Sequence, residues 1–425
     1  MRTIETINAV IMALFFLCYS YQFYYVAVAL LRRRKFEGRN EYHRIAVLIA
    51  ARNEENVIGQ LLDSIRAQTY PMDRVDIFVG ADNCTDDTAG VARAHGATVY
   101  ERFNTEQVGK GYVLNELLQR IKRPGHRHYD AYLVLDADNI LDPNFISEIE
   151  KVYSAGYEIV TCYRNSKNYG DNWISAGYAV WFLREAKFLS QARLTLNTSC
   201  AISGTGFFIA AHVLKESGGW KWHLLTEDIE FSASSIIEGR RIAYCPTAML
   251  YDEQPITFID SWNQRFRWAK GFYQVFWHYA GKLFKGIFTN PKGKRFACYD
   301  MLMTIAPAML LTIISIGFNG TIALLAIFGV ISAGTMITSA LSSMFFCLFN
   351  FMLFMFIFGV LTTFTEWDNI HSTTAKKIGY LFTFPIFQLT YIPIALVALV
   401  KKASWKPIAH TISVDVEEMS QTGMK

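Results

Sequence analysis

The stretch Tyr129–Asp138, YDAYLVLDAD, joins a short apolar run to two aspartates that are separated by one residue. Apolar runs of this length that end in polar residues are typical of buried strands. A similar run, HRIAVLIAA, occupies His43–Ala51, and another, VDIFVG, occupies Val75–Gly80. Helical patterns at 57–68 and 89–95 follow these two runs, and Ala97–Tyr100 reads as a further short strand. This alternation predicts an α/β fold with a Rossmann-like, mostly parallel sheet.

Polar clusters follow three of these predicted strands directly. They are Arg52–Glu55, the acidic segment Ala81–Thr88, and the pair Asp136 and Asp138. Ligands of parallel α/β sheets bind at the carboxyl ends of the strands, so the three clusters predict one shared site. No Gly-x-Gly-x-x-Gly follows the first strand and no Gly-x-x-x-x-Gly-Lys-Ser/Thr is present, which leaves dinucleotide and P-loop interpretations without their main support.

Three long apolar blocks flank the region that carries these strands. Hydrophobic residues make up 52% of the 425 residues, and they concentrate in Ile7–Leu31, Cys298–Phe364 and Ile378–Val400. Each block exceeds the roughly 18 to 20 apolar residues that cross a bilayer. We therefore expect a transmembrane anchor in residues 1–35, a water-soluble domain large enough for an enzyme in 36–290, and a membrane bundle with a short tail in 291–425.

Charge placement predicts the orientation of the chain in the membrane. Four basic residues, Arg32–Lys35, follow the first apolar block, and positive flanks remain on the cytosolic side. This predicts an integral protein of the plasma (inner) membrane with its central domain in the cytosol, and it disfavours a cleaved signal peptide or a nucleic-acid site. The block Cys298–Phe364 can hold two or three spans, with Asn319–Gly320 and Ser332–Gly334 as candidate breaks. The side on which Lys401–Lys406 lies stays open.

The seven cysteines are scattered along the chain without zinc or redox spacing. In a cytosolic domain they are most simply small buried apolar residues.

Two carboxylates at the end of a strand, Asp136 and Asp138, can hold a hard divalent cation such as Mn²⁺ or Mg²⁺ through oxygen while a diphosphate fills its other positions. By itself the pair is a weak signal, because aspartate is common in turns after strands.

Two segments further along the chain strengthen the interpretation of Asp136 and Asp138 as part of a functional site. Thr226–Asp228 is expected to open a helix, and its alternative interpretation is an ordinary helix cap. Gln264, Arg267 and Trp268 share one face of a predicted aromatic-rich helix within 258–283, and offer an amide, a planar cation and an indole. Their alternative is an amphipathic helix on a membrane surface. This helix and the stretch 172–190 are both expected to lie along the membrane.

Taken in order, the motifs resemble those of family 2 glycosyltransferases, in particular the membrane-integrated synthases of cellulose, chitin, hyaluronan and poly-N-acetylglucosamine. The resemblance covers most of the chain and is carried by Ala50–Glu54, Asp82–Thr88, Gly109–Gly111, Asp136–Asp138, Gly204–Gly206, Thr226–Asp228 and Gln264–Trp268. Two departures occur: Ala50 stands where proline is common, and Ala81 stands where an aspartate often precedes Asp82.

The resemblance implies a GT-A fold and a role for each motif. The roles it implies are donor or acceptor binding for Glu54, Asp82, Lys110, Asp136, Gln264, Arg267 and Trp268, metal binding for Asp138 with Asp136, and catalysis for Thr226, Glu227 and Asp228. Asp82 would contact uracil, and Asp228 would act as general base. The helix face that carries Gln264, Arg267 and Trp268 would bind the diphosphate and the acceptor.

The function that follows from the resemblance is a processive, inverting transfer from a UDP-sugar to a growing β-linked polysaccharide. One alternative is a non-processive transferase that glycosylates a membrane lipid. Another, from a different class, is a non-catalytic transport or assembly subunit. Ionisable residues are few in the apolar blocks, which disfavours an ion pathway, and the complete acid set disfavours a dead enzyme.

Overall fold

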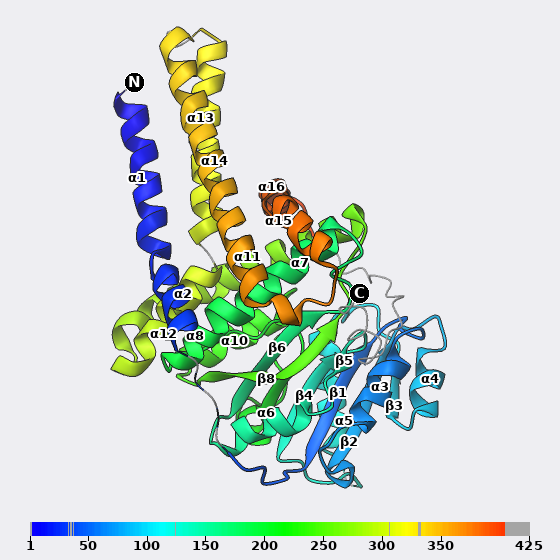
Figure 1. Ribbon diagram of the computed structural model, residues 1–425. Coiled ribbons are helices and arrows are strands. Elements are labelled where there is room, and N and C mark those ends of the chain that lie inside the picture. The colour runs from blue at the N-terminus through cyan, green and yellow to red at the C-terminus, as the bar shows by residue number, and fades with distance from the viewer. Residues whose placement is uncertain are drawn as a thin grey trace.

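The computed structural model describes residues 2–32, 34, 36, 38–123, 125–305, 307–329 and 333–403. A single mixed sheet dominates the part of the chain between the apolar ends (Figure 1). Within the described residues its strands are β1 (Ile45–Ala51), β2 (Val75–Asp82), β3 (Thr98–Arg102), β4 (Ala131–Asp136), β5 (Ile140–Leu141), β6 (Ile159–Ser166), β7 (Phe207–Ala210) and β8 (Ile242–Asp252).

The strand order is β3-β2-β1-β4-β7-β6-β8-β5. The pairs β3–β2, β2–β1, β1–β4 and β6–β8 are parallel, as the α/β alternation predicts. β7 runs antiparallel to both of its neighbours, and β5 runs antiparallel to β8. The predicted Rossmann-like α/β sheet is therefore confirmed, with antiparallel pairing confined to the half that follows β4.

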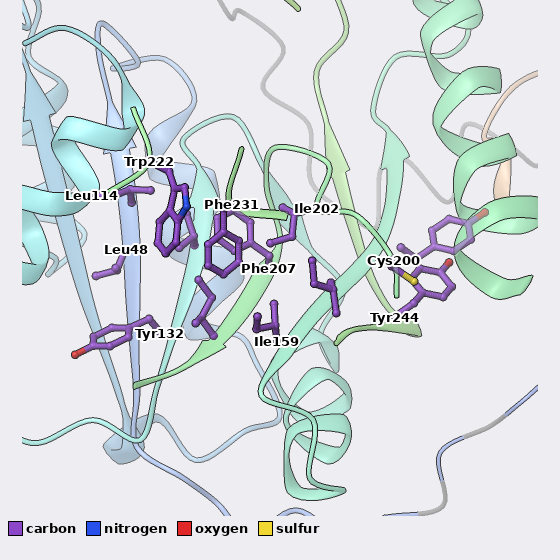
Figure 2. Packing of buried hydrophobic residues seen from close by; sticks show 14 of the residues in the cluster. Leu48, Leu114, Tyr132, Ile159, Cys200, Ile202, Phe207, Trp222, Phe231 and Tyr244 are labelled. Atoms are coloured by element: carbon purple, nitrogen blue, oxygen red, sulfur yellow. The ribbon is translucent and has the colours of Figure 1, made fainter. Parts of the chain in front are cut away.

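Helices pack on both faces of this sheet. Those around it are α3 (Ile58–Arg66), α4 (Thr88–Ala94), α5 (Lys110–Ile121), α6 (Phe145–Ser154), α9 (Ala211–Glu216) and α10 (Glu227–Ile237), with a short 3-10 helix, η1 (Met72–Arg74). β1 shows why two cores form: alternate side chains point to opposite faces, so Leu48 joins one core while Val47 and Ile49 join the other. The first core includes Leu114, Phe207, Trp222 and Phe231 (Figure 2).

The apolar blocks form long helices that rise away from the sheet (Figure 1). They are α1 (Arg2–Tyr19) with α2 (Tyr21–Leu31), α13 (Pro307–Ile327), α14 (Ala333–Thr365), and α15 (Thr374–Leu389) with α16 (Tyr391–Val400). Among the described residues, the segments Ile4–Leu31, Ser342–Thr365 and Thr374–Val400 are long and apolar enough to cross a membrane. These helices support membrane association.

The block 298–364 contains the helices α13 and α14 in its described part. The candidate break Asn319–Gly320 lies inside α13 instead, and the side-chain amide of Asn319 exchanges hydrogen bonds of 3.0 and 2.9 Å with that of Asn8 in α1. The other candidate break lies at the start of α14, where Ser332 is outside the described residues. Arg33, Lys35 and the tail from residue 404, which includes part of the basic segment Lys401–Lys406, are also outside them.

Between the sheet and the long helices lies a layer of connecting helices (Figure 1). It consists of α7 (Trp173–Arg184), a π-helical stretch η2 (Glu185–Ser190), α8 (Gln191–Thr195), α11 (Phe258–Thr289) and α12 (Lys292–Ile305), and the 3-10 helix η3 (Trp367–Asn369) follows α14. α7 was expected to be amphipathic on a membrane surface, but its side chains are buried on nearly every side. It is packed between β6 and the helices α14 and α15.

Candidate active site

Acidic side chains gather at the carboxyl ends of the central strands. Asp82 ends β2, Asp136 ends β4 and Asp252 ends β8. Because β2, β1 and β4 are parallel neighbours, their polar ends lie on one edge of the sheet, as the sequence predicts. The loops and helices that follow these strands supply the remaining groups of the site.

Lys110, the first residue of α5, meets Asp136 at the centre of this edge. Its ammonium donates to Asp136 Oδ1 at 2.5 Å and to the Gly204 carbonyl at 2.8 Å. Thr205 Oγ1 accepts from the Asp136 amide at 2.9 Å, so the Gly204–Gly206 loop is fixed to the end of β4. Gly206 has a φ of +63°, and a Cβ there would lie 2.1 Å from Leu250 Cδ2. This loop therefore requires glycine for both backbone and space.

Asp138, two residues beyond Asp136, is buried. Its Oδ2 accepts from the Glu253 amide at 3.1 Å, just beyond the end of β8. The two halves of the sheet thus meet at the acid pair.

Glu227 and Asp228 form the first turn of α10 and are half-buried. Burial raises the pKa of Asp228, although Lys110 and backbone hydrogen bonds that include Gly204 oppose this. Burial, and then the charge of Asp228, raises the pKa of Glu227 as well. Carboxyls with raised pKa values next to a cation suit proton transfer.

Thr226 occupies the N-cap position of α10 but makes no capping hydrogen bond through its side chain. The alternative interpretation of Thr226 as an ordinary side-chain cap is therefore wrong. Instead its buried side chain packs against Gly271 of α11, where an added Cβ would lie 2.5 Å from Thr226 Cγ2. The motif around Asp228 is thereby held against α11.

α11 carries Gln264, Arg267 and Trp268, all of which are half-buried. Burial lowers the pKa of Arg267, and the negative charges of Glu227, Asp136 and Asp228 oppose this effect. Trp268 packs edge-on against Tyr178 and Phe182 of α7, with ring centroids 5.7 and 6.1 Å apart.

The neighbouring Arg265 has a structural role that was not predicted from the sequence. It is 1% exposed and donates to the Phe387 carbonyl at 3.1 Å and to Thr390 Oγ1 at 2.7 Å. α11 is therefore bonded through Arg265 to the joint between α15 and α16, which fixes the direction in which Arg267 and Trp268 point.

Asp82 and Glu54 come from the ends of the neighbouring strands β2 and β1. The buried Asp82 carboxylate accepts from Arg102 at 2.6 Å and from Asn83 at 3.1 Å, so any contact with a nucleotide base would share this carboxylate with Arg102. Glu54 follows β1, and its amide donates to Thr88 Oγ1 at 2.8 Å. The charge of Glu54, like that of Asp138, acts on Lys167.

Three charged residues of the site, Arg164, Lys167 and Asp252, were not predicted from the sequence. Arg164 of β6 donates to Asp252 at 2.6 Å and to the Ser203 carbonyl at 2.9 Å. Lys167, just past β6, is buried, and its Nζ has no hydrogen-bond partner among the described residues. Their only signal in the sequence was that charged residues fall at or near the ends of strands, which is too common to single them out.

The carboxylates fit a divalent cation that is shared with a ligand. Burial, opposed by Arg164, raises the pKa of Asp252, and the charges of Asp138 and Asp136 raise it further, so three acids repel one another here. Within the described residues no group of three His, Cys, Asp or Glu side chains is close enough to hold a metal alone. Mg²⁺ characteristically binds through one or two carboxylates plus phosphate oxygens, and this site offers that arrangement.

Comparisons with known proteins agree with the fold. The chain is 26% identical over 258 residues to a beta-monoglucosyldiacylglycerol synthase of Synechocystis sp., covering 59% of this chain and 52% of that one. It is 28% identical over 274 residues to a poly-beta-1,6-N-acetyl-D-glucosamine synthase of Staphylococcus aureus, covering 62% and 61%. The match therefore spans between about half and three-fifths of the length of these relatives.

Among solved structures, a mannosyltransferase from Pyrobaculum calidifontis in complex with GDP-Man and Mn²⁺ superposes with a TM-score of 0.57. The alignment covers 92% of this chain and 99% of that one at 17% identity, which supports a shared fold. The family model described as glycosyltransferase like family 2 matches residues 43–271, more than half of the 425 residues. The chain therefore belongs to the family 2 glycosyltransferases, with a GT-A fold.

Proposed function

We propose that this membrane-associated glycosyltransferase transfers a sugar from a UDP-sugar to the end of a β-linked polysaccharide, with inversion at the anomeric carbon. The observation that carries the proposal is that Lys110, Asp136 and Asp228 come from three separate segments and meet at the Gly204 loop, with the charge of Arg267 acting on both acids. Two cations beside a carboxyl of raised pKa are what a diphosphate leaving group and a proton acceptor require.

In this scheme the donor diphosphate lies between Lys110 and Arg267, with Gln264 beside it. Asp136 and Asp138 would hold Mn²⁺ or Mg²⁺, which when bound neutralises charge on the diphosphate. Asp82 and Glu54, at the ends of β2 and β1, are assigned to the nucleotide part of the donor.

The acceptor hydroxyl attacks the anomeric carbon from the face opposite the diphosphate. The new C–O bond forms as the bond to phosphate oxygen breaks, and Asp228 takes the hydroxyl proton, a role that accounts for roughly 10²–10⁴-fold in rate. Glu227 and Thr226 hold Asp228 in place, and Trp268 supplies an apolar face for a sugar ring. We place the catalytic domain on the cytosolic side of the plasma (inner) membrane, as the basic segment after the first span suggests.

A second candidate is transfer of one sugar to a membrane lipid. It is favoured by the similarity to the beta-monoglucosyldiacylglycerol synthase. The residues of the site serve both reactions, since both need the same donor chemistry.

The test is to incubate the purified protein with radiolabelled UDP-glucose, UDP-N-acetylglucosamine, UDP-glucuronic acid and GDP-mannose in turn, and to size the products. The polysaccharide proposal expects polymer from one UDP-sugar. A single-sugar glycolipid would support the second candidate, and transfer from GDP-mannose alone would overturn the choice of UDP.

A further inference from the structure

The second half of α11 exposes three large aromatic side chains. Trp277, Phe284 and Phe288 are 80%, 58% and 63% exposed, and the rings of the two phenylalanines lie 5.4 Å apart. Spacings of seven and four residues put all three on one side of the helix. Leu283 and Gly286, on another side, are buried. Within the described part of the chain, α11 therefore ends in an aromatic stripe that stays uncovered.

The residues around this stripe are basic. We call residues 277–296, which join the end of α11 to the start of α12, the α11–α12 corner. The corner contains no Asp or Glu and five exposed basic residues, namely Lys282, Lys285, Lys292, Lys294 and Arg295. None of the five forms an ion pair with another described residue. A positively charged surface without its own counterions attracts an anionic partner.

An aromatic stripe with lysines beside it is the makeup of a helix that lies in a membrane interface. Lys282 and Lys285 are three residues apart, so they line one flank of the stripe. Lysine stems are long enough to keep the ammonium among lipid headgroups while aromatic rings sit deeper. The two kinds of side chain in the corner therefore match the two layers of a membrane surface.

Contacts place the corner beside the first candidate membrane span, Ile4–Leu31. The Phe296 ring lies 5.8 Å from that of Tyr21, and the Tyr299 hydroxyl donates to the Cys18 carbonyl at 3.1 Å. Both partners belong to the later half of the span, which is followed by the basic segment described above. Figure 1 shows α12 beside α2, at the base of α1. The corner thus lies toward the basic end of the span, where a bilayer places its headgroups.

We propose that the α11–α12 corner binds a membrane surface that carries anionic phospholipids, with its aromatic stripe inserted below the headgroups and its basic side chains paired with their phosphates. The unpaired positive charges select an anionic surface over a zwitterionic one. The contacts with the first span favour a lipid surface over a soluble acidic protein. No residue of the candidate active site takes part, so this inference goes beyond the proposed function and does not depend on it.

The test compares the affinities of phosphatidylglycerol and phosphatidylcholine for the full-length protein in neutral detergent, measured by native mass spectrometry. The corner variant removes three exposed charges: Lys282→Gln, Lys285→Gln and Lys292→Gln. The matched control removes three exposed charges next to the sheet, at the end of α5 and in α9: Lys122→Gln, Arg123→Gln and Lys215→Gln. Both triple variants should unfold at the wild-type temperature without added lipid, because exposed lysines and arginines contribute little to stability.

We expect the wild type to bind phosphatidylglycerol about 10-fold or more tightly than phosphatidylcholine, because each basic residue near an anionic surface adds to the attraction. The corner variant should lose most of this preference, and the control variant should keep it. Equal affinities of the wild type for the two lipids, or equal losses in the two variants, would overturn the inference.

Insertion of the aromatic stripe is measured separately, in phosphatidylglycerol vesicles whose acyl chains carry bromine. The difference in fluorescence between the wild type and Trp277→Phe isolates Trp277 from the other tryptophans, and we expect this difference signal to be quenched. An unquenched Trp277 would overturn the inference. So would a corner variant that changes the oligomeric mass but not lipid binding, since a second copy of the chain would then cover the corner.

Discussion

At the scale of single residues, the proposed reaction depends on two adjacent carboxyls, Glu227 and Asp228, in the first turn of α10. Both have raised pKa values because they are buried together, yet Lys110 and Arg267 lie close enough for their charges to act on them. A helix N-terminus favours negative charge and so favours the ionised form of both acids. The ionised carboxylate is the form that can accept a proton. Which of the two takes the proton is a question that mutation can answer.

Replacement of Asp228 by Asn should lower sugar transfer by about 10²-fold or more, because an amide cannot accept a proton at neutral pH. UDP binding should persist, since Lys110 and Arg267 carry that contact in the proposed scheme. The measurement is transfer at saturating donor beside a UDP titration. Glu227→Gln is the matched comparison and should be less damaging; the reverse order would assign the base to Glu227.

Removal of divalent metal tests the acid pair. Activity should disappear with EDTA and return with Mn²⁺ or Mg²⁺, because Asp136 and Asp138 with a diphosphate complete the ligand set of a hard cation. Asp138→Asn should raise the metal concentration that is needed for half-maximal activity. Full turnover in chelator would contradict the metal assignment of these residues.

At the scale of elements, α11 connects the chemistry to the membrane helices. Its face toward the site carries Arg267 and Trp268, while Arg265 on another face is bonded to the joint between α15 and α16. Gly271, one turn further on, allows Thr226 to pack directly on the helix backbone. The position of Asp228 therefore depends on the close approach of α10 and α11.

Gly271→Ala should lower transfer by about 10-fold or more, since the added Cβ would lie 2.6 Å from Thr226 Oγ1 and must move the segment that carries Asp228. Gly281→Ala on the same helix is the matched control, because nothing lies within 4 Å of its added Cβ. That change should leave transfer intact and stabilise the helix by up to about 1 kcal/mol. Equal activities of the two variants would show that α10 does not depend on this contact.

At the scale of the whole molecule, one buried ion pair joins the N-terminal span to the connecting helices. Arg193 of α8 donates to both oxygens of Asp300 in α12, at 2.7 and 2.8 Å, and Tyr21 and Tyr25 of α2 donate to the same carboxylate at 2.9 and 2.7 Å. Asp300 is 1% exposed. From the sequence it was only an isolated acid near the edge of an apolar block.

Asp300→Asn should destabilise the folded protein by about 3–5 kcal/mol, because it leaves the Arg193 charge buried without its counterion. Thermal unfolding in detergent, followed by loss of activity, measures the effect. Glu101→Gln, which breaks the exposed Arg93–Glu101 pair, is the comparison and should change stability by less than about 1 kcal/mol. Similar unfolding temperatures for both variants would show that the Arg193–Asp300 ion pair does not stabilise the folded protein.

The sequence by itself determined the class of sheet, the apolar helices and the motif residues. Strands such as β1 and β4 are short apolar runs that end in acids, so their pattern and their polar ends are local properties of the chain. The order of the motifs was sufficient to predict the family, because the residues expected to bind a nucleotide sugar occur in short, recognisable motifs.

Only the tertiary structure decided which charges meet. Arg164 with Asp252, Arg193 with Asp300 and Arg265 with Phe387 are each separated by 88 or more positions in the chain. No local pattern distinguishes these arginines from exposed ones. The antiparallel pairing of β7 and the burial of α7 likewise depend on what packs against them. Burial and long-range pairing arise from contacts between distant segments, and those contacts exist only in the folded chain.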